Sequence, residues 1–307
     1  MSHILYPDIP LQKFFDEPIL ESEHCDPGYT GHATDVWRVR TSSQTVALRL
    51  SEDDAWGGPF WDGLRRLFKW RALTPNQVAQ RNRFLCEGGG LPVPSLLGHG
   101  RFKDPLRDRS LSYLIMEWLP GLRCATFAEL SEAGLESYGV HLARLHSHVL
   151  PQAGFLSGSH SCLSGEFGAR AAKTLTWLAE TYFQDDPDLT GWLPEMCRQA
   201  LDIRPTRCVP VLVDLDPTQY LRNEAGELCA LIDTDAYVIG PRELDFIDLE
   251  YVLTVPQAIA FARGYSTLLP LPDLLEVRVV YRYLYRLMEV FPGDFSPDEW
   301  LTHPGIF

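Results

Sequence analysis

Residues 209–248 read VPVLVDLDPTQYLRNEAGELCALIDTDAYVIGPRELDFID. Two pairs of acids in this stretch each follow a short apolar run: Asp214 and Asp216 follow 209–213, and Asp233 and Asp235 follow 228–232. The polar, glycine-containing segment between the runs has the composition of a hairpin turn. We therefore expect two adjacent strands that deliver their carboxylates to one place. Carboxylates gathered in this way repel one another unless a cation lies among them, so the stretch predicts a divalent metal site.

The bulk composition is that of a globular protein. The chain has 307 residues, of which 45% are hydrophobic, enough for a core in one large domain or two lobes. Its formal net charge of −14 argues against a broad nucleic-acid-binding face, because phosphate binding needs clustered Lys and Arg. An acidic balance fits a cationic substrate, although many soluble proteins are acidic without binding one.

The cysteines and the hydropathy indicate the compartment. The seven cysteines are scattered, odd in number and without C-x-x-C spacing, which predicts free thiols rather than disulfides or a zinc site. No basic leader precedes an apolar segment at the N-terminus, and no apolar run is long enough to span a bilayer. We therefore expect a cytoplasmic protein with neither a membrane nor a nucleic-acid partner.

Strand patterns dominate the first part of the chain and helical patterns the second. A glycine-containing turn at 27–35 precedes alternating runs at 36–40 and 44–50, and an apolar run at 112–121 ends in Pro-Gly. Helical periodicity then recurs at 135–148, 165–183, 193–203, 256–268 and 273–290. The change predicts an N-terminal sheet lobe over 1–117 and a mainly helical lobe over 118–307.

An aromatic and basic segment at 56–71 interrupts the strand-rich part. Its apolar residues recur at helical spacing with Arg and Lys between them. A lid over a ligand and a partner-binding face are two interpretations. An inserted amphipathic helix that covers the sheet is the simpler one, because an apolar stripe of this period usually forms core. A second helix is expected at 75–87, stopped by three glycines at 88–90.

This order of features resembles the aminoglycoside phosphotransferase and choline kinase group, the small-molecule branch of the protein-kinase-like fold. The landmarks, in order, are the turn at 28–34, the strand around Arg49, Gly90-Leu91-Pro92-Val93-Pro94, the hinge at 116–121, 142–146, Asp214-Leu215-Asp216-Pro217, Ile232-Asp233 and 261–265. The resemblance implies an α+β bilobal fold, with an N-terminal antiparallel-sheet lobe and a mainly helical C-terminal lobe. It also implies a kinase that transfers the γ-phosphoryl group of ATP or GTP to a hydroxyl of a small-molecule acceptor.

The resemblance further implies roles for individual residues. Asp214 would be the catalytic base, Asp245 would brace the catalytic loop, and Gln219 and Asp233 would hold Mg²⁺. The nucleotide contacts would be Gly28, Thr30, Gly31, Arg49, Met116, Glu117 and Trp118. Carboxylate and amide oxygens are hard ligands that suit Mg²⁺, so the residue types agree with the implied metal.

Three positions depart from the pattern of the group. Leu212-Val213 stands where His-Gly is usual, Gln219 where Asn is usual, and Arg49 where Lys is usual. Gln keeps the amide oxygen but adds a methylene, and Arg replaces a point donor by a planar fork. The helical Glu that normally pairs with the Lys has no clear match, with Gln77 or Gln80 near its place. A catalytically weak or inactive kinase-like protein that binds nucleotide or a partner is therefore the alternative, and nucleotidyl transfer is a third hypothesis.

Several other residues near these motifs each allow two interpretations. Asp216 and Asp235 are either additional ligands or turn-forming residues. His146 is more readily interpreted as a packed or capping histidine than as a catalytic one. The aromatic cluster at 281–286 either lines an acceptor pocket or belongs to the core, which is the commoner case. The acceptor, the choice between ATP and GTP, and the oligomeric state are not predicted.

Overall fold

The computed structural model describes residues 4–6, 8–26, 32–52, 55–104, 109–156, 160–290 and 296–307. The chain forms two compact units. Unit 1 comprises Met1–Gly57, Ala72–Arg83 and Val93–Pro120, and unit 2 comprises Gly58–Arg71, Phe84–Pro92 and Gly121–Phe307. The predicted N-lobe over 1–117 also contained 58–71 and 84–92. The structure places these two segments in unit 2, where Leu64, Leu67, Phe68 and Leu85 are fully buried.

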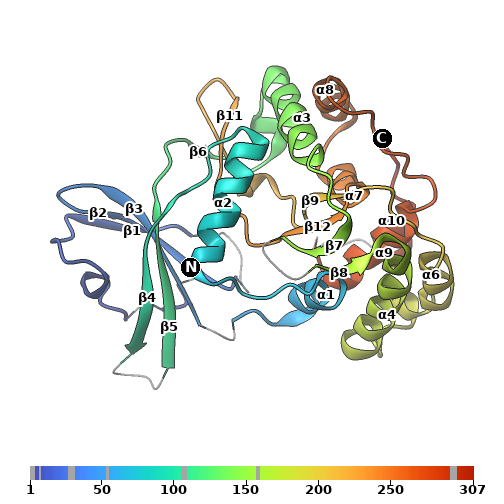
Figure 1. The fold of residues 1–307 in the computed structure, drawn as a ribbon, viewed down its shortest axis with the longest axis horizontal. Helices are drawn as coiled ribbons and strands as arrows, with labels where there is room; N and C mark the ends of the chain where they lie inside the picture. The colour runs from blue at the N-terminus through green and yellow to red at the C-terminus, as the bar shows by residue number, and fades with distance from the viewer. Residues whose placement is uncertain are drawn as a thin grey trace. The chain divides into compact units, whose positions relative to one another are not determined.

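Unit 1 is built on one antiparallel sheet with the strand order β1-β2-β3-β5-β4 (Figure 1). Its strands are β1 (Glu21–His24), β2 (Asp35–Arg40), β3 (Thr45–Glu52), β4 (Leu96–Asp104) and β5 (Arg109–Glu117). Val46, Leu48 and Leu50 alternate along β3 and are fully buried against the short 3-10 helix η1 (Leu11–Phe14). Because side chains alternate along a strand, Arg49 lies on the opposite face of the sheet.

Helix α2 (Pro75–Gly89) begins at the predicted residue and ends two residues later than predicted, within the run of three glycines. Pro75 occupies the first helical position, where its missing N–H costs nothing. Gly90 follows the helix with φ +77°, a left-handed conformation that glycine adopts without steric cost.

Unit 2 contains two small sheets. The first has the order β8-β7-β12-β9 and consists of β7 (Gln152–Phe155), β8 (His160–Leu163), β9 (Cys208–Leu212) and β12 (Tyr237–Pro241). The second has the order β11-β10-β6 and consists of β6 (Leu122–Arg123), β10 (Tyr220–Arg222) and β11 (Leu228–Leu231).

The predicted pairing of 209–213 with 228–232 is wrong. β9 pairs with β12, and β11 pairs with β10 in the other sheet. The 3-10 helix η3 (Pro217–Gln219) breaks the extended chain after β9, so a new strand begins at Tyr220. The polar segment with Gly226 at φ +76° is a turn as expected, but it joins β10 to β11.

The helices account for most of unit 2. They are α1 (Gly58–Phe68), η2 (Phe127–Glu129), α3 (Glu132–His146), α4 (Ser164–Tyr182), α5 (Pro187–Thr190), α6 (Leu193–Ala200), α7 (Glu243–Val252), α8 (Val255–Ser266), α9 (Arg278–Met288) and α10 (Pro297–Thr302). The helices predicted from periodicity are thus present, although α9 begins later than the expected residue 273. None of the helices in the described part of the chain is long and apolar enough to cross a membrane. All seven cysteines are free thiols.

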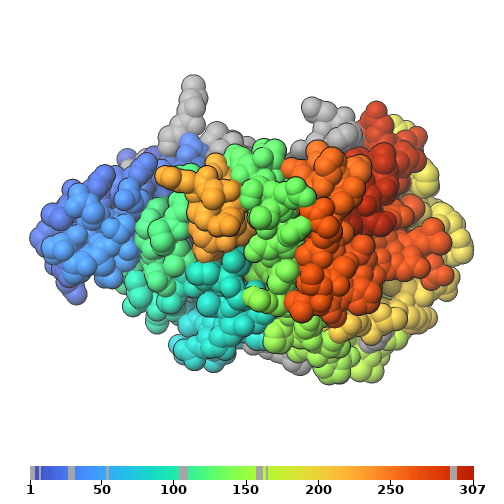
Figure 2. Space-filling model, turned by 90° about the horizontal axis from the view of Figure 1, so that it is seen from above, coloured from blue at the N-terminus to red at the C-terminus, as the bar shows by residue number. Residues whose placement is uncertain are grey.

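Helices α3 and α8 pack closely because glycine faces backbone at two positions. A Cβ added to Gly139 would lie 2.1 Å from the carbonyl oxygen of Phe261, and one added to Gly264 would lie 1.9 Å from that of Glu136. The two helices lie side by side in Figure 1 and again at the surface in Figure 2, where α3 is green and α8 is orange.

Helix α1 lies against the first sheet of unit 2. Leu64, Leu67 and Phe68 are fully buried, and the Phe68 ring occupies the space beside Gly240 of β12. The interpretation of 56–71 as an amphipathic helix is confirmed, but the sheet that it covers is that of unit 2 and not the N-terminal sheet that was expected. The cluster at 281–286 belongs to the core, because Tyr281, Tyr283 and Tyr285 are buried.

Candidate active site

The chain after β9 forms a loop that we call the first acidic loop, residues 212–219. Its turn is built by Asp216, whose carboxylate accepts the backbone N–H of Thr218 at 2.7 Å and caps η3. Pro217 at the first position of η3 fixes the backbone for this turn. Asp216 therefore has the turn-forming role that was one of its two interpretations.

Asp214 lies in the first acidic loop among other acids. Burial, together with the neighbouring carboxylates of Asp216 and Asp233, raises the pKa of Asp214 to about 7. The side-chain amide nitrogen of Gln219 lies 3.2 Å from Asp214 Oδ2 and donates to it. The structure thus brings Asp214, Gln219 and Asp233 together, as the sequence predicts, although the strands that carry them are not paired.

A second acidic loop, residues 232–236, joins β11 to β12. The backbone N–H of Ile232 donates to the carbonyl oxygen of Gln219 at 2.7 Å, which ties this loop to the first one. Asp233 Oδ1 accepts the N–H of Asp235 at 3.2 Å. The indole N–H of Trp70 donates to the carbonyl oxygen of Asp235 at 2.8 Å, so residues just beyond α1 also hold the loop.

The donor groups at these two loops fit a divalent cation. Burial and, after it, the nearby carboxylates of Asp216 and Asp233 raise the pKa of Asp214, and a cation would offset the repulsion among these carboxylates. No group of three or more His, Cys, Asp or Glu side chains in the described ranges is arranged to hold a metal by itself. Mg²⁺ commonly takes only one or two carboxylates and completes its shell with water and substrate phosphates. Asp233 and Gln219 are the residues that would hold it here.

Asp245 of α7 holds the start of the first acidic loop. Its carboxylate is fully buried, and Oδ1 accepts the backbone N–H of Leu212 at 2.9 Å. His146 Nε2 lies 3.0 Å from Oδ2, so the same carboxylate joins α7, α3 and the loop. Each of these contacts is between buried groups, where an unmatched polar atom is costly.

A chain of hydrogen bonds fixes the tautomer of His146. Arg242 Nη1 donates to Tyr265 Oη at 3.2 Å, and Tyr265 Oη lies 2.9 Å from His146 Nδ1. Burial lowers the pKa of His146 well below its usual value, so the ring is neutral and carries one N–H. Arg242 donates to the Tyr265 oxygen, and the Tyr265 hydroxyl in turn donates to Nδ1. The ring N–H then sits on Nε2 and donates to Asp245, so that each of the three contacts pairs one donor with one acceptor. His146 is thus a packed histidine, as interpreted, with a defined polar role.

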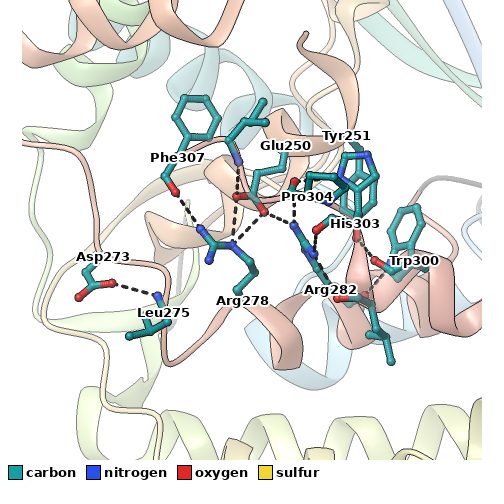
Figure 3. Close-up of polar contacts among 12 residues, drawn as sticks. Glu250, Tyr251, Asp273, Leu275, Arg278, Arg282, Trp300, His303, Pro304 and Phe307 are labelled. Atoms are coloured by element: carbon teal, nitrogen blue, oxygen red, sulfur yellow. Dashed lines mark hydrogen bonds and ion pairs between the residues drawn. The ribbon is translucent and has the colours of Figure 1, made fainter. Parts of the chain in front are cut away.

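Helix α7 is itself anchored by a buried ion-pair group (Figure 3). Glu250 accepts Arg282 Nη2 at 2.7 Å and Arg278 Nε at 3.1 Å, which ties α7 to α9. Arg278 Nη2 also donates to the carbonyl oxygen of Phe307 at 2.8 Å, and Arg282 donates to that of Leu301 at 3.1 Å. Removing one partner from a buried ion pair is strongly destabilising, so this group fixes the helix that carries Asp245.

The predicted nucleotide contacts belong to unit 1. Gly28, Thr30 and Gly31 lie outside the described residues. Arg49 is on β3, opposite Leu114 of β5. The hinge residues follow at the end of β5: Met116 is buried, Glu117 accepts the N–H of Ser95 at 3.3 Å, and Trp118 lies 5.5 Å from the Arg38 guanidinium.

A scan against family models finds a match over most of the chain. The model described as "Phosphotransferase enzyme family" matches residues 30–278, most of the chain. The chain belongs to this family. A comparison of the sequence of this phosphotransferase with curated proteins finds no match.

Solved structures similar to this phosphotransferase show its fold. A candidate fructosamine-3-kinase from Haemophilus somnus 129PT is 14% identical with a TM-score of 0.59, covering 95% of this chain and 93% of that one. The macrolide 2'-phosphotransferase MphH from Brachybacterium faecium is 13% identical with a TM-score of 0.54, covering 96% of each chain. Aminoglycoside phosphotransferase APH(4)-Ia is 18% identical with a TM-score of 0.56, covering 90% and 87%. The protein has the α+β protein-kinase-like fold that the sequence predicts.

Two residues beside the site of this phosphotransferase were not predicted. Trp70 lies in the aromatic and basic segment, whose pattern indicates a helix but not a contact with Asp235. Asp248 lies at the end of the stretch 209–248. Its spacing of three residues from Asp245 on an expected helix was the available signal, because residues i and i+3 share a helix face.

Proposed function

We propose that this protein is a kinase that transfers the γ-phosphoryl group of ATP or GTP to a hydroxyl group of a small molecule. The observation that carries the proposal is the grouping of Asp214, Asp216 and Asp233 with the Gln219 amide at two joined loops. Membership of the phosphotransferase family supports the reaction class. Similar structures hold ADP or GDP, which supports a nucleotide as co-substrate.

In this proposal Asp214 is the base. Its carboxylate accepts the proton of the acceptor hydroxyl while that oxygen forms a bond to the γ-phosphorus, and the bond from the γ-phosphorus to the β,γ-bridging oxygen breaks. The products are the phosphorylated acceptor and the nucleoside diphosphate.

The other proposed roles concern charge and position. Mg²⁺, when bound by Asp233 and Gln219, neutralises charge on the phosphates. The Gln219 amide orients Asp214 through its 3.2 Å hydrogen bond. Asp245 holds the loop at Leu212, and Arg49 and the turn at 28–31 contact the nucleotide phosphates. The hinge at 116–118 contacts the rest of the nucleotide.

For the acceptor we propose a cationic hydroxyl compound, with amino sugars and amino alcohols as first candidates. The net charge of −14 and the three acids at the site favour a positively charged molecule. Structures of similar proteins contain kanamycin or hygromycin B. A phosphorylation screen with purified protein and a library of hydroxyl compounds would identify the acceptor.

The alternative is a kinase-like protein with little or no catalytic activity. The observation that favours it is the set of departures: Leu212-Val213, Gln219 and Arg49. Such a protein would bind nucleotide, or a protein partner, without transferring phosphate.

Thermal unfolding with ATP or GTP, each with and without Mg²⁺, is the first test. A ligand at about 100 times its dissociation constant stabilises the folded state by about 2.7 kcal/mol, which raises Tm by several degrees. We expect the rise to depend on Mg²⁺. Absence of any shift with either nucleotide would argue strongly against the kinase proposal.

Variants then separate the proposed roles. Asp214→Ala should abolish turnover and keep the nucleotide-dependent shift, whereas Asp233→Ala should lose the part of the shift that needs Mg²⁺. Asp202→Ala, at an exposed acid, is the control and should behave as wild type. Equal nucleotide consumption by wild type and Asp214→Ala would refute the role given to Asp214. Nucleotide binding without turnover by wild type would favour the alternative.

A further inference from the structure

Helix α7 presents two acids, not one, to the first acidic loop. Asp245 and Asp248 are three residues apart, so they lie on one face of the helix. Asp245 accepts the N–H of Leu212 at 2.9 Å, and Asp248 Oδ2 accepts the N–H of Leu215 in a long hydrogen bond of 3.4 Å. The two amides are also three residues apart, and Asp214 lies between them.

Asp248 lies in surroundings that disfavour a carboxyl group in the folded state. The residue is fully buried, and its Oδ1 has no hydrogen-bond partner among the residues that the structure describes. Burial and the Asp245 and Asp214 carboxylates hold the pKa of Asp248 well above its usual range. A buried carboxyl without a full set of hydrogen-bond partners is less favourable at such a position than an apolar side chain that fits the space.

A neutral carboxyl suits the contact with the loop. In that form one oxygen remains an acceptor for the Leu215 N–H, and the other carries a proton. The hydroxyl of Tyr285, from α9, is buried and has no hydrogen-bond partner in the described part of the chain. Burial, and after it the Asp248 carboxyl, raises the pKa of Tyr285, and α9 packs against α7. The aromatic helix α9 thus backs Asp248.

We infer that Asp248 is a positioning residue, which holds the backbone on one side of Asp214 while Asp245 holds it on the other. The inference rests on the proposed function, because it assigns Asp248 to the loop that carries the proposed base. A loop fixed at both ends keeps Asp214 in one orientation, and misplacement of a reacting group by an ångström lowers rate steeply. In this chain, Leu212 and Val213 contribute no polar side chain before Asp214, so the loop depends on its backbone hydrogen bonds to α7.

Two substitutions separate the contact from packing. Asp248→Asn keeps a neutral side chain with an oxygen acceptor for Leu215, and Asp248→Leu removes the acceptor but keeps the branched shape and the number of side-chain heavy atoms. Leu249→Val on the same helix is the control for a general loss of packing, because Leu249 is fully buried. If Asp248→Leu does not fold, Asp248→Ala takes its place.

The first measurement is residue-resolved hydrogen exchange of the folded protein, which does not require turnover. We expect Asp248→Leu to speed exchange of the Leu215 amide about tenfold or more relative to Leu212, since local opening sets the exchange rate. Asp248→Asn should stay close to wild type, and Leu249→Val should not change the ratio of the two amides. An unchanged Leu215 rate in Asp248→Leu would overturn the inference.

The second measurement is hydrolysis of Mg-ATP and Mg-GTP by the same variants. We expect kcat to fall about tenfold in Asp248→Leu, with the nucleotide KM little changed, and Asn to restore most of it. A fall no larger than that of Leu249→Val would also overturn the inference. If wild type hydrolyses neither nucleotide and binds neither, the proposed function fails, and the exchange result alone then decides whether Asp248 holds the loop.

Discussion

The indole N–H of Trp70 donates to the backbone carbonyl oxygen of Asp235 at 2.8 Å, across 165 residues of sequence. Trp70 is buried and packs against Trp61, with ring centroids 4.4 Å apart. The segment 58–71 therefore has two structural roles. Helix α1 covers a sheet of unit 2, and Trp70, just beyond the helix, holds the loop that carries Asp233.

Trp70→Phe should weaken the response of the protein to Mg²⁺. The substitution keeps an aromatic ring but removes the donor, which leaves the Asp235 carbonyl without this bond and costs about 1–3 kcal/mol of stability. We expect a lower Tm and a several-fold higher Mg²⁺ concentration for half-maximal nucleotide-dependent stabilisation. Trp192→Phe, which loses an exposed indole bond to Asp298, is the control. Equal Mg²⁺ dependence in the two variants would show that Trp70 does not position the loop.

Gly139→Ala should destabilise the protein by separating α3 from α8. The new methyl group would meet the carbonyl oxygen of Phe261 at 2.1 Å, and a backbone atom in a packed helix cannot move aside cheaply. We expect a loss of about 2–4 kcal/mol in urea unfolding, the range of severe packing errors. Gly165→Ala, at an exposed position of α4 with nothing within 4 Å of the new methyl group, should be neutral or slightly stabilising. Similar unfolding midpoints for the two variants would contradict the close-packing account.

Stability should fall with pH below neutrality, partly through His141. Burial, the largest cause, and Arg144 lower the pKa of His141 from 6.5 to about 4, against a hydrogen bond to the Gly89 carbonyl oxygen. Because the pKa of His141 is lower in the folded state, the unfolded state binds a proton at a higher pH than the folded state does. The contribution is therefore complete above pH 6.5 and is lost as pH falls to 4, about 3 kcal/mol in all.

The test is urea unfolding at pH 7.5 and pH 5.0, with wild type and His141→Asn. Between these conditions wild type should lose about 2 kcal/mol more than His141→Asn, from this group alone. His99→Asn, at an exposed histidine, should keep the wild-type dependence. The same pH dependence in wild type and His141→Asn would mean that His141 is not the source.

Asp245→Asn should be among the most damaging single-atom changes in unit 2. Both oxygens of Asp245 face donors, the Leu212 N–H and His146 Nε2, so an amide NH₂ would oppose one of them. We expect a loss of about 1–3 kcal/mol, the cost of leaving a buried hydrogen-bonding group without its partner. A double-mutant cycle with His146→Leu should show a coupling of about 1 kcal/mol or more. Additive effects in that cycle would indicate that the two side chains do not interact.

Several parts of the fold follow from local pattern. The alternation of β3, the stop after α2 and the helical periods of α3, α4 and α8 depend on residues near one another in sequence. The order of landmarks was sufficient to indicate the family, and the grouping of Asp214 with Asp233 was predicted correctly. The pairing partners were not, because β9 and β11 have similar apolar composition and either could pair with a neighbour through a turn.

The sequence by itself determined several strands (β2, β3, β5, β9 and β11), most of the longer helices, and which acids sit at loop starts, because backbone periodicity and turn chemistry are local properties. Only the tertiary structure decided what these segments contact: β9 beside β12, α1 within unit 2, Trp70 on Asp235, and Asp248 under Leu215. Such contacts join residues far apart in sequence, and they depend on which buried faces and unpaired polar atoms match once the chain is compact. The residues 209–248 thus predict an acidic site, and the packing of α7 and α1 around them gives it its geometry.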